Sequence, residues 1–251
     1  MRQLNRLIVI VAVLGAGLAP ALGARAAGDL DEAVRVYRER QDQATPAAVL
    51  ALLREGNRRF VAGDSTHGGI PTDARERVQV AARGQRPLAA ILSCIDSRTA
   101  PEMVFDTSVG DLFTARVAAN VVNDDVIGSL EIAAASGAKV IVILGHTDCG
   151  GIKGACNGLE LGHLTQLLER VKPAIASTNA RLDADAERSR DIGERIATNR
   201  RYVAEVSHAN AVQSTEQIRA RSPLLREMID AGEVILVTAV FDVDTGRVVF
   251  D

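Results

Sequence analysis

The sequence predicts an α/β protein with three layers (α/β/α), in which a mainly parallel central sheet lies between helices. Apolar runs at residues 88–94, 139–146 and 233–243 are too evenly hydrophobic for strands with one face in water, so both faces should be covered. Helical segments lie between these runs, and strands that alternate with helices form parallel sheets covered on both faces. A turn in DVDTGRVVF, residues 242–250, predicts a short antiparallel strand at the C-terminal edge.

The first 26 residues are typical of a secretory signal peptide. They have a basic start, a continuous apolar stretch, and small residues at Ala24 and Ala26, where a signal peptidase reads the chain. We therefore expect cleavage near residue 26 and a periplasmic or secreted protein that is not stably inserted in a membrane. An uncleaved anchor is the alternative, although glycine and proline interrupt a stretch already short for a span of about 20 residues.

The remaining chain, residues 27–251, is expected to form one domain. The full sequence of 251 residues is 47% hydrophobic and 24% charged, which is enough for one substantial core. Removal of the signal peptide lowers the count of Lys and Arg from 29 to 26 against 32 acidic residues, a net charge of −6. An acidic surface argues against nucleic acid as a partner.

Helical patterns precede the core and fill the spaces between strands. Residues 29–43 are charged and helical in pattern, and a second helix should begin after Thr45, a good N-cap, with Pro46 in its first turn, and end before Gly63. A further strand is expected at 111–118. Helices are expected at 126–138 and 161–175, and a polar, largely helical region at 177–222.

Three cysteines, Cys94, Cys149 and Cys156, are an odd number for an exported protein, so at least one thiol is unpaired. Cys94 falls at the C-terminal end of the first strand, and His146 and Cys149 at the end of the strand at 139–146. Loops at that edge of a parallel sheet converge on a ligand-binding crevice. Two thiolates and an imidazole suit zinc, and three protein ligands leave a fourth position open. Cys156 is interpreted as a small buried apolar residue.

Asp96 and Arg98 follow Cys94 closely and are expected to form an ion pair. Asp96 could be the fourth zinc ligand, or could accept a hydrogen bond from a bound water. A guanidinium holds a carboxylate with two hydrogen bonds, so Arg98 would decide where Asp96 points. Ile95, between these polar residues, is expected to face the core.

The chain resembles the β-class carbonic anhydrases. The resemblance rests on CIDSR, GDLFTARVAANVV, GSLEIA and GHTDCGGIKGA in that order, and extends to EGNRRFVAG upstream and RSPLLREMIDAGEVILVTAVFDVDTG downstream. It covers nearly all of the chain from about residue 50 onward. The chain departs from the family at RVAAN, where one small residue differs, and it has no tryptophan, so the Trp-containing bicarbonate pocket of some bacterial members cannot be present in its usual form.

The resemblance implies one zinc ion per chain on Cys94, His146 and Cys149, with Asp96 and Arg98 acting beside it. It also implies reversible hydration of carbon dioxide to bicarbonate by a zinc-bound hydroxide. Family members are dimers or larger assemblies, so a homodimer or homotetramer is expected, with N-terminal helices packed on a partner subunit. Gly150 is a candidate for substrate binding through its backbone N–H. No proton shuttle is identified among His67, His163 and His208.

Three other functions stay open from the sequence. A zinc hydrolase of the same fold could act on carbonyl sulfide or carbon disulfide, because substrate range depends on the shape of the channel. A non-catalytic zinc-binding protein would hold the metal structurally with Asp96 fixed on it. A thiol-redox protein is the least supported, because the chain has no CxxC motif.

Overall fold

The computed structural model describes residues 39, 42–66, 85 and 87–251. The predicted signal peptide at residues 1–26 and most of the charged segment at 29–43 lie outside these residues. Within the described part of the chain, no helix combines the length and the apolar character that a membrane crossing needs.

The core is a five-stranded sheet in the order β2-β1-β3-β4-β5. The first four strands are parallel, and the last pairs antiparallel with β4 at the edge. The predicted fold class and every predicted strand are therefore confirmed. The strands are β1 (Ala89–Ser93), β2 (Leu112–Arg116), β3 (Val140–His146), β4 (Ile235–Phe241) and β5 (Val248–Phe250).

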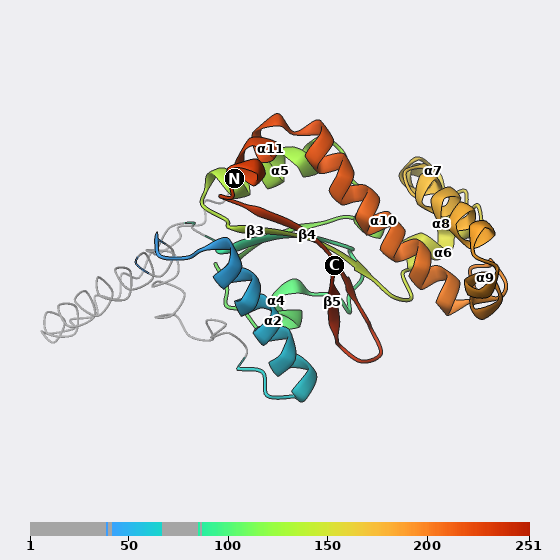
Figure 1. Ribbon diagram of the computed structural model, residues 1–251, viewed down its shortest axis with the longest axis horizontal. Coiled ribbons are helices and arrows are strands. Elements are labelled where there is room, and N and C mark those ends of the chain that lie inside the picture. Colours follow the sequence, from blue (N-terminus) through green and yellow to red (C-terminus); the bar gives the residue numbers. More distant parts are fainter. Residues whose placement is uncertain (1–38, 40–41, 67–84, 86) are drawn as a thin grey trace, which may run out of the picture.

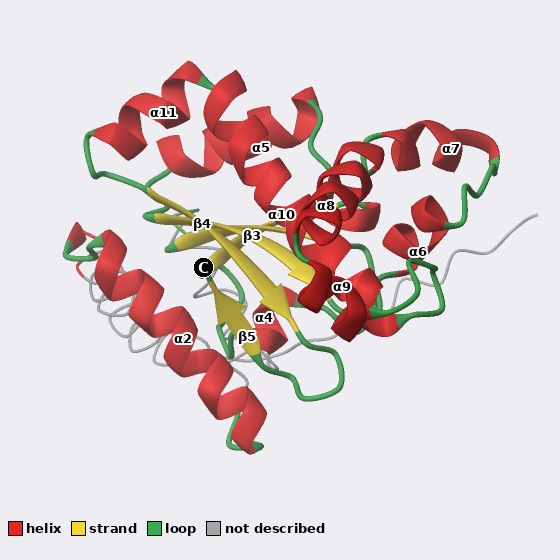
Figure 2. Cartoon of the chain, turned by 45° about the vertical axis from the view of Figure 1, so that its right-hand side comes forward, coloured by secondary structure: helices red, strands yellow, loops and turns green. Residues whose placement is uncertain are grey.

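Helices cover both faces of the sheet (Figures 1 and 2). Alternate residues of β1 point to opposite sides: Ala90 and Leu92 join one buried cluster, and Ala89 and Ile91 join another. The first cluster is completed by α5 (Asp124–Ala135), α10 (Arg200–Arg221) and α11 (Pro223–Asp230), and the second by α2 (Pro46–Ala62) and α4 (Pro101–Val104). β1 and β3 are buried along their whole length, as the even apolar runs predict.

The helix α2 begins and ends where the sequence predicts. The Thr45 side chain accepts a hydrogen bond from the Ala48 amide, and Gly63 closes the helix with a left-handed φ of 76°. Gly56 allows α2 to approach the C-terminal end of α4 closely, because a Cβ there would stand 1.8 Å from the Phe105 carbonyl oxygen. Val49 and Leu53 are buried against this chain's own sheet. Packing of this region on a partner subunit stays a prediction.

A helical region beyond β3 forms a third buried cluster beside the C-terminal ends of the strands. It contains α6 (Gly150–Cys156), α7 (Gly162–Glu169), α8 (Lys172–Ala184) and α9 (Ala186–Ile192). The single helix predicted at 161–175 is in fact two. Pro173 lies in the first turn of α8, where a missing N–H is tolerated, whereas in a helix interior it would break the hydrogen-bond ladder.

The prediction that β4 is buried on both faces is wrong for its first half. Ile235, Leu236 and Val237 are only partly buried. β5 pairs only with residues 239–241, so among the described residues the start of β4 has no paired strand on that side. An apolar run indicates that a strand can be buried, but it does not indicate how far the neighbouring strand in the sheet extends.

Candidate metal centre

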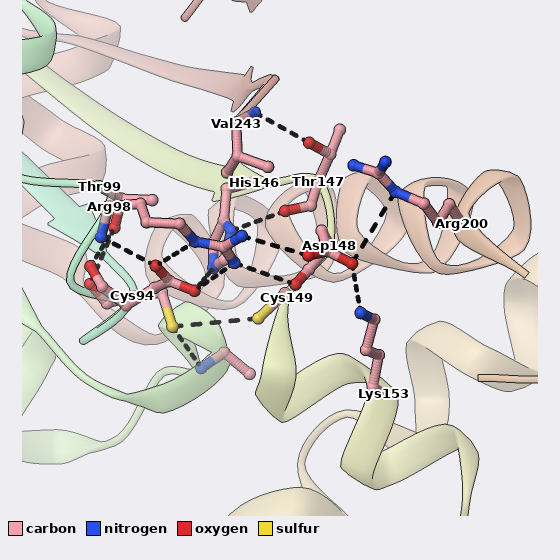
Figure 3. A network of polar contacts seen from close by, with 12 residues as sticks. Cys94, Arg98, Thr99, His146, Thr147, Asp148, Cys149, Lys153, Arg200 and Val243 are labelled. Carbon is pink, nitrogen blue, oxygen red and sulfur yellow. Dashed lines mark hydrogen bonds and ion pairs between the residues drawn. The ribbon is translucent and has the colours of Figure 1, made fainter. Parts of the chain in front are cut away.

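Three predicted donors meet at the C-terminal edge of the sheet. Cys94 follows β1 directly, His146 is the last residue of β3, and Cys149 caps the N-terminus of α6. One ligand atom from each lies within 4.8 Å of the others, and all three residues are buried. The two sulfur atoms are 3.9 Å apart (Figure 3). The arrangement predicted from two distant sequence segments is therefore present.

The His146 ring is oriented with one nitrogen free to bind a cation. Its Nδ1 lies 2.9 Å from the Thr147 carbonyl oxygen, which can only accept, so Nδ1 carries the proton. Its Nε2 is buried and has no hydrogen-bond partner in the described part of the chain, and the residue is 1% exposed. A buried nitrogen lone pair without a partner is costly, and metal ligation removes that cost.

The Cys94 and Cys149 thiols share one hydrogen bond. The hydrogen bond shared with Cys149 lowers the pKa of Cys94 to about 4, and the same bond together with burial raises the pKa of Cys149. A bound cation would release the second proton, because a coordinating thiol is deprotonated outright. Two sulfurs and one nitrogen fit a borderline-soft divalent ion such as zinc.

Asp96 lies beside this cluster and is held by Arg98. The guanidinium donates to both carboxylate oxygens, from Nε at 2.9 Å and Nη2 at 2.8 Å, so the predicted ion pair is present. These hydrogen bonds lower the pKa of Asp96 to about 2. Asp96 Oδ2 is 4.0 Å from His146 Nε2, close to the donors but outside the compact group of three. Asp96 as a fourth ligand stays a prediction.

A second carboxylate, Asp148, links Arg98 to further cations. Its Oδ2 accepts from Arg98 Nη1 at 3.2 Å, its Oδ1 accepts from Lys153, and Arg200 Nε lies 3.9 Å away (Figure 3). The Lys153 hydrogen bond lowers the pKa of Asp148. The sequence reading missed this residue, although its position between His146 and Cys149 was a signal that it would lie at the site.

Backbone groups around Cys94 are also held by residues that the sequence reading did not select. Arg116 donates from Nε to the Cys94 carbonyl at 2.9 Å and from Nη2 to the Asp96 carbonyl at 2.5 Å. The Ala119 N–H donates to the Cys94 sulfur at 3.3 Å. The loop that carries Cys94 is thus held both by the Arg116 side chain and by the Ala119 backbone.

The prediction that Ile95 faces the core is wrong, because it is 62% exposed. β1 ends at Ser93, so the alternation of a strand no longer applies two residues later. Gly150 begins α6 and is exposed, and a Cβ there would meet no atom of the described residues within 4 Å. Its role in substrate binding stays a prediction.

Cys156, His163 and His208, the other described cysteine and histidines, do not belong to the donor group. All three cysteines are free thiols, and Cys156, the last residue of α6, is half-buried against the third apolar cluster, where burial raises its pKa to about 11. His208 pairs with Asp251 at 3.0 Å. His67 lies outside the described residues.

Comparison with known proteins is consistent with this centre. Residues 89–248 match the family model described as carbonic anhydrase. Carbonic anhydrase 2 of Mycobacterium tuberculosis is 33% identical over 210 residues, which cover 81% of this chain and 92% of the relative. The carbonic anhydrase of Mycolicibacterium smegmatis is 32% identical over 209 residues, with the same coverage of 81% and 92%.

A solved structure of a β-carbonic anhydrase has the same fold as this chain. A tetrameric β-carbonic anhydrase from Sordaria macrospora superposes with a TM-score of 0.61 at 26% identity, covering 75% of this chain and 90% of the other. The match of the family model over more than half of the chain, the identity to curated relatives and the shared fold lead to one conclusion. This chain belongs to the carbonic anhydrase family, in its β class.

Proposed function

We propose that this chain catalyses the zinc-dependent, reversible hydration of carbon dioxide to bicarbonate. The observation that carries the proposal is the unpartnered Nε2 of His146, buried between two thiols and next to a carboxylate that Arg98 holds. Cys94, His146 and Cys149 would hold one zinc ion. When bound, zinc would act as a Lewis acid and lower the pKa of a bound water to about 7.

The chain's own groups then orient the reactants. Asp96 is ionised at neutral pH, because its pKa is lowered to about 2, so it is available to accept a hydrogen bond from water in the crevice. Arg98 keeps the carboxylate in place with two parallel hydrogen bonds, which removes its rotational freedom before substrate arrives. Cys94 and Cys149 are buried, so their sulfur atoms are shielded from bulk water.

Replacement of Asp96 by Asn tests the assignment. The amide keeps the size of the side chain but loses the negative charge, so we expect kcat to fall about 10²- to 10⁴-fold, the usual contribution of a positioned acid–base group. Zinc content should stay near one per chain. Asp191→Asn is the matched control, because Asp191 forms an exposed pair with Arg201 at 3.1 Å, and it should leave turnover unchanged.

The same assays separate the alternatives. Unchanged turnover in Asp96→Asn would contradict the role of the carboxylate. Bound zinc without carbon dioxide hydration at pH 8 to 9 in the unaltered protein would contradict the proposed activity. In that case, hydrolysis of carbonyl sulfide or carbon disulfide would assign the site to those substrates, and inactivity toward all three would leave a structural metal.

We also propose export and self-association. The signal-like residues 1–26 support cleavage and a periplasmic or secreted protein, which N-terminal sequencing of the extracytoplasmic protein would test. The similar Sordaria macrospora enzyme is described as tetrameric, which supports a homodimer or homotetramer here. Light scattering of the purified protein would refute this if it gave the mass of one chain.

A further inference from the structure

A strained turn touches the metal-site sulfur. The 3₁₀ turn Ala118–Asn120 follows β2, and its middle residue, Ala119, donates its N–H to Cys94 Sγ at 3.3 Å. Ala119 and Asn120 have φ values of 55° and 42°, in the left-handed region that residues with a Cβ rarely adopt. Such a backbone conformation is costly, and it persists only where its surroundings hold it.

Two buried side chains of α10 supply that support. Asn210 Nδ2 donates to the Ala119 carbonyl at 2.7 Å, and Ser214 Oγ donates to the Asn120 carbonyl at 3.3 Å. Asn210 is 1% exposed and Ser214 lies one helical turn further along. Two side chains of α10 therefore hold two consecutive carbonyls of the turn.

Fixing the Ala119 carbonyl also fixes the direction of the Ala119 N–H, because both groups belong to one residue with a defined φ and ψ. Without the Asn210 bond, the residue could relax toward an ordinary backbone conformation, and its N–H would turn away from the sulfur. A hydrogen bond to a thiolate takes up part of its charge, so it tunes how strongly the sulfur donates to a metal.

We propose that Asn210 is a positioning residue for the metal site, which aims the Ala119 N–H at the Cys94 thiolate through the Ala119 carbonyl. The proposal rests on the metal site proposed above but not on its substrate. Asn210 touches neither the sulfur nor the crevice group Asp96 in the contacts described, so its influence passes through the turn.

The test uses the full protein loaded with cadmium-113. In the unaltered protein, the Ala119 amide proton should show scalar coupling to the metal through the Cys94 sulfur. In Asn210→Leu, and in Asn210→Asp, which keeps the side-chain size but removes the donor, this coupling should be lost and the cadmium resonance should shift. The zinc dissociation constant, measured by chelator competition, should rise about 10- to 100-fold.

Two further variants make the result specific. Ser214→Ala removes only the longer bond to Asn120 and should give a smaller change in the same direction. It also serves as the test if the Asn210 variants do not fold. Asn57→Leu is the matched control, because Asn57 is another buried amide, bonded to the Val104 and Gly246 carbonyls at 3.1 and 2.9 Å. It should lower the melting temperature while leaving the coupling and the dissociation constant unchanged.

The proposal would be overturned if the Asn210 variants fold and keep the original coupling and zinc dissociation constant. If they do not fold, the same result for a folded Ser214→Ala variant would overturn it. An equal loss of metal affinity in Asn57→Leu would also overturn it, since the effect would then be general destabilisation. Failure of the proposed function is separate: an unaltered protein that binds metal with the Ala119 coupling but does not hydrate carbon dioxide would refute the activity alone.

Discussion

Replacement of Gly151 by Ala should disturb the metal centre more than it disturbs the fold. Gly151 lies in the first turn of α6, two residues after Cys149. A Cβ at this position would stand 2.9 Å from the Ala119 Cβ and 3.1 Å from the Ala119 nitrogen. Carbon contacts are optimal at about 3.5–4.0 Å, so the turn or the helix must retreat by about 0.6–1 Å.

The cost to stability is small because two effects oppose each other. Overpacking costs about 1–3 kcal/mol, whereas alanine is favoured over glycine within a helix by about 1 kcal/mol. A net loss near 1 kcal/mol corresponds to a fall in Tm of about 2–4 °C for a chain of this size. The retreat occurs at the N–H that holds Cys94, however, and a displacement of about 1 Å at a site can cost 100-fold in rate.

Stopped-flow hydration of carbon dioxide and thermal unfolding measure the two effects separately. We expect kcat/KM to fall about 100-fold in Gly151→Ala with only that small change in Tm. Gly128→Ala is the control, because Gly128 lies within α5 and its Cβ would meet nothing within 4 Å. It should gain about 1 kcal/mol and keep full activity. A Gly151→Ala variant as active as the unaltered protein, and as stabilised as Gly128→Ala, would refute the reasoning.

Four other changes have defined outcomes. Asp148→Asn weakens the partly exposed ion pair between Asp148 and Arg98, which is worth about 0.5–1 kcal/mol. We therefore expect kcat/KM to fall about two- to five-fold, with zinc content unchanged. Gly150→Ala should reduce kcat/KM if substrate approaches that backbone, and full activity would contradict its predicted role. Chelation of the metal should abolish hydration but leave the circular dichroism of the sheet intact. For Asp106, burial raises the pKa, but hydrogen bonds from Arg59 and Thr66 together lower it by more. The pKa of Asp106 in the folded protein is therefore below that in the unfolded chain. Its stabilisation is present above about pH 4 and is lost as pH falls through the folded pKa, so the Tm difference from Arg59→Gln should shrink in acid.

The sheet and the donor set were predictable because both follow from local patterns. Even apolar runs identify the strands that are covered on both faces, and the polar residues that end them are read directly from the chain. Cys94 and His146 meet because β1 and β3 are adjacent and parallel. The ends of α2 were equally accessible, since Thr45 and Gly63 act on the backbone beside them.

Support for the site was not predictable, because it depends on contacts between distant segments. Asn210 bonds a carbonyl 91 residues earlier in the chain, and nothing in its own helix distinguishes it from a solvated amide. Arg116 reads as the polar end of a strand, yet it holds the carbonyls of Cys94 and Asp96. Ile95 shows the same limit, because the alternation that would bury it ended with the strand.

The strand register fixes the metal donors before any metal binds. Ser93 of β1 pairs with Leu144 of β3, so Cys94 lies one residue beyond a defined pair and His146 two residues beyond it. A slip of one residue would move every side chain of β1 to the opposite face of the sheet, away from the buried cluster that it now joins. The donor spacing is therefore set by the hydrophobic core of the sheet, and the polar contacts of Ala119, Arg98 and Asp148 adjust the chemistry of a site whose position the core has already determined.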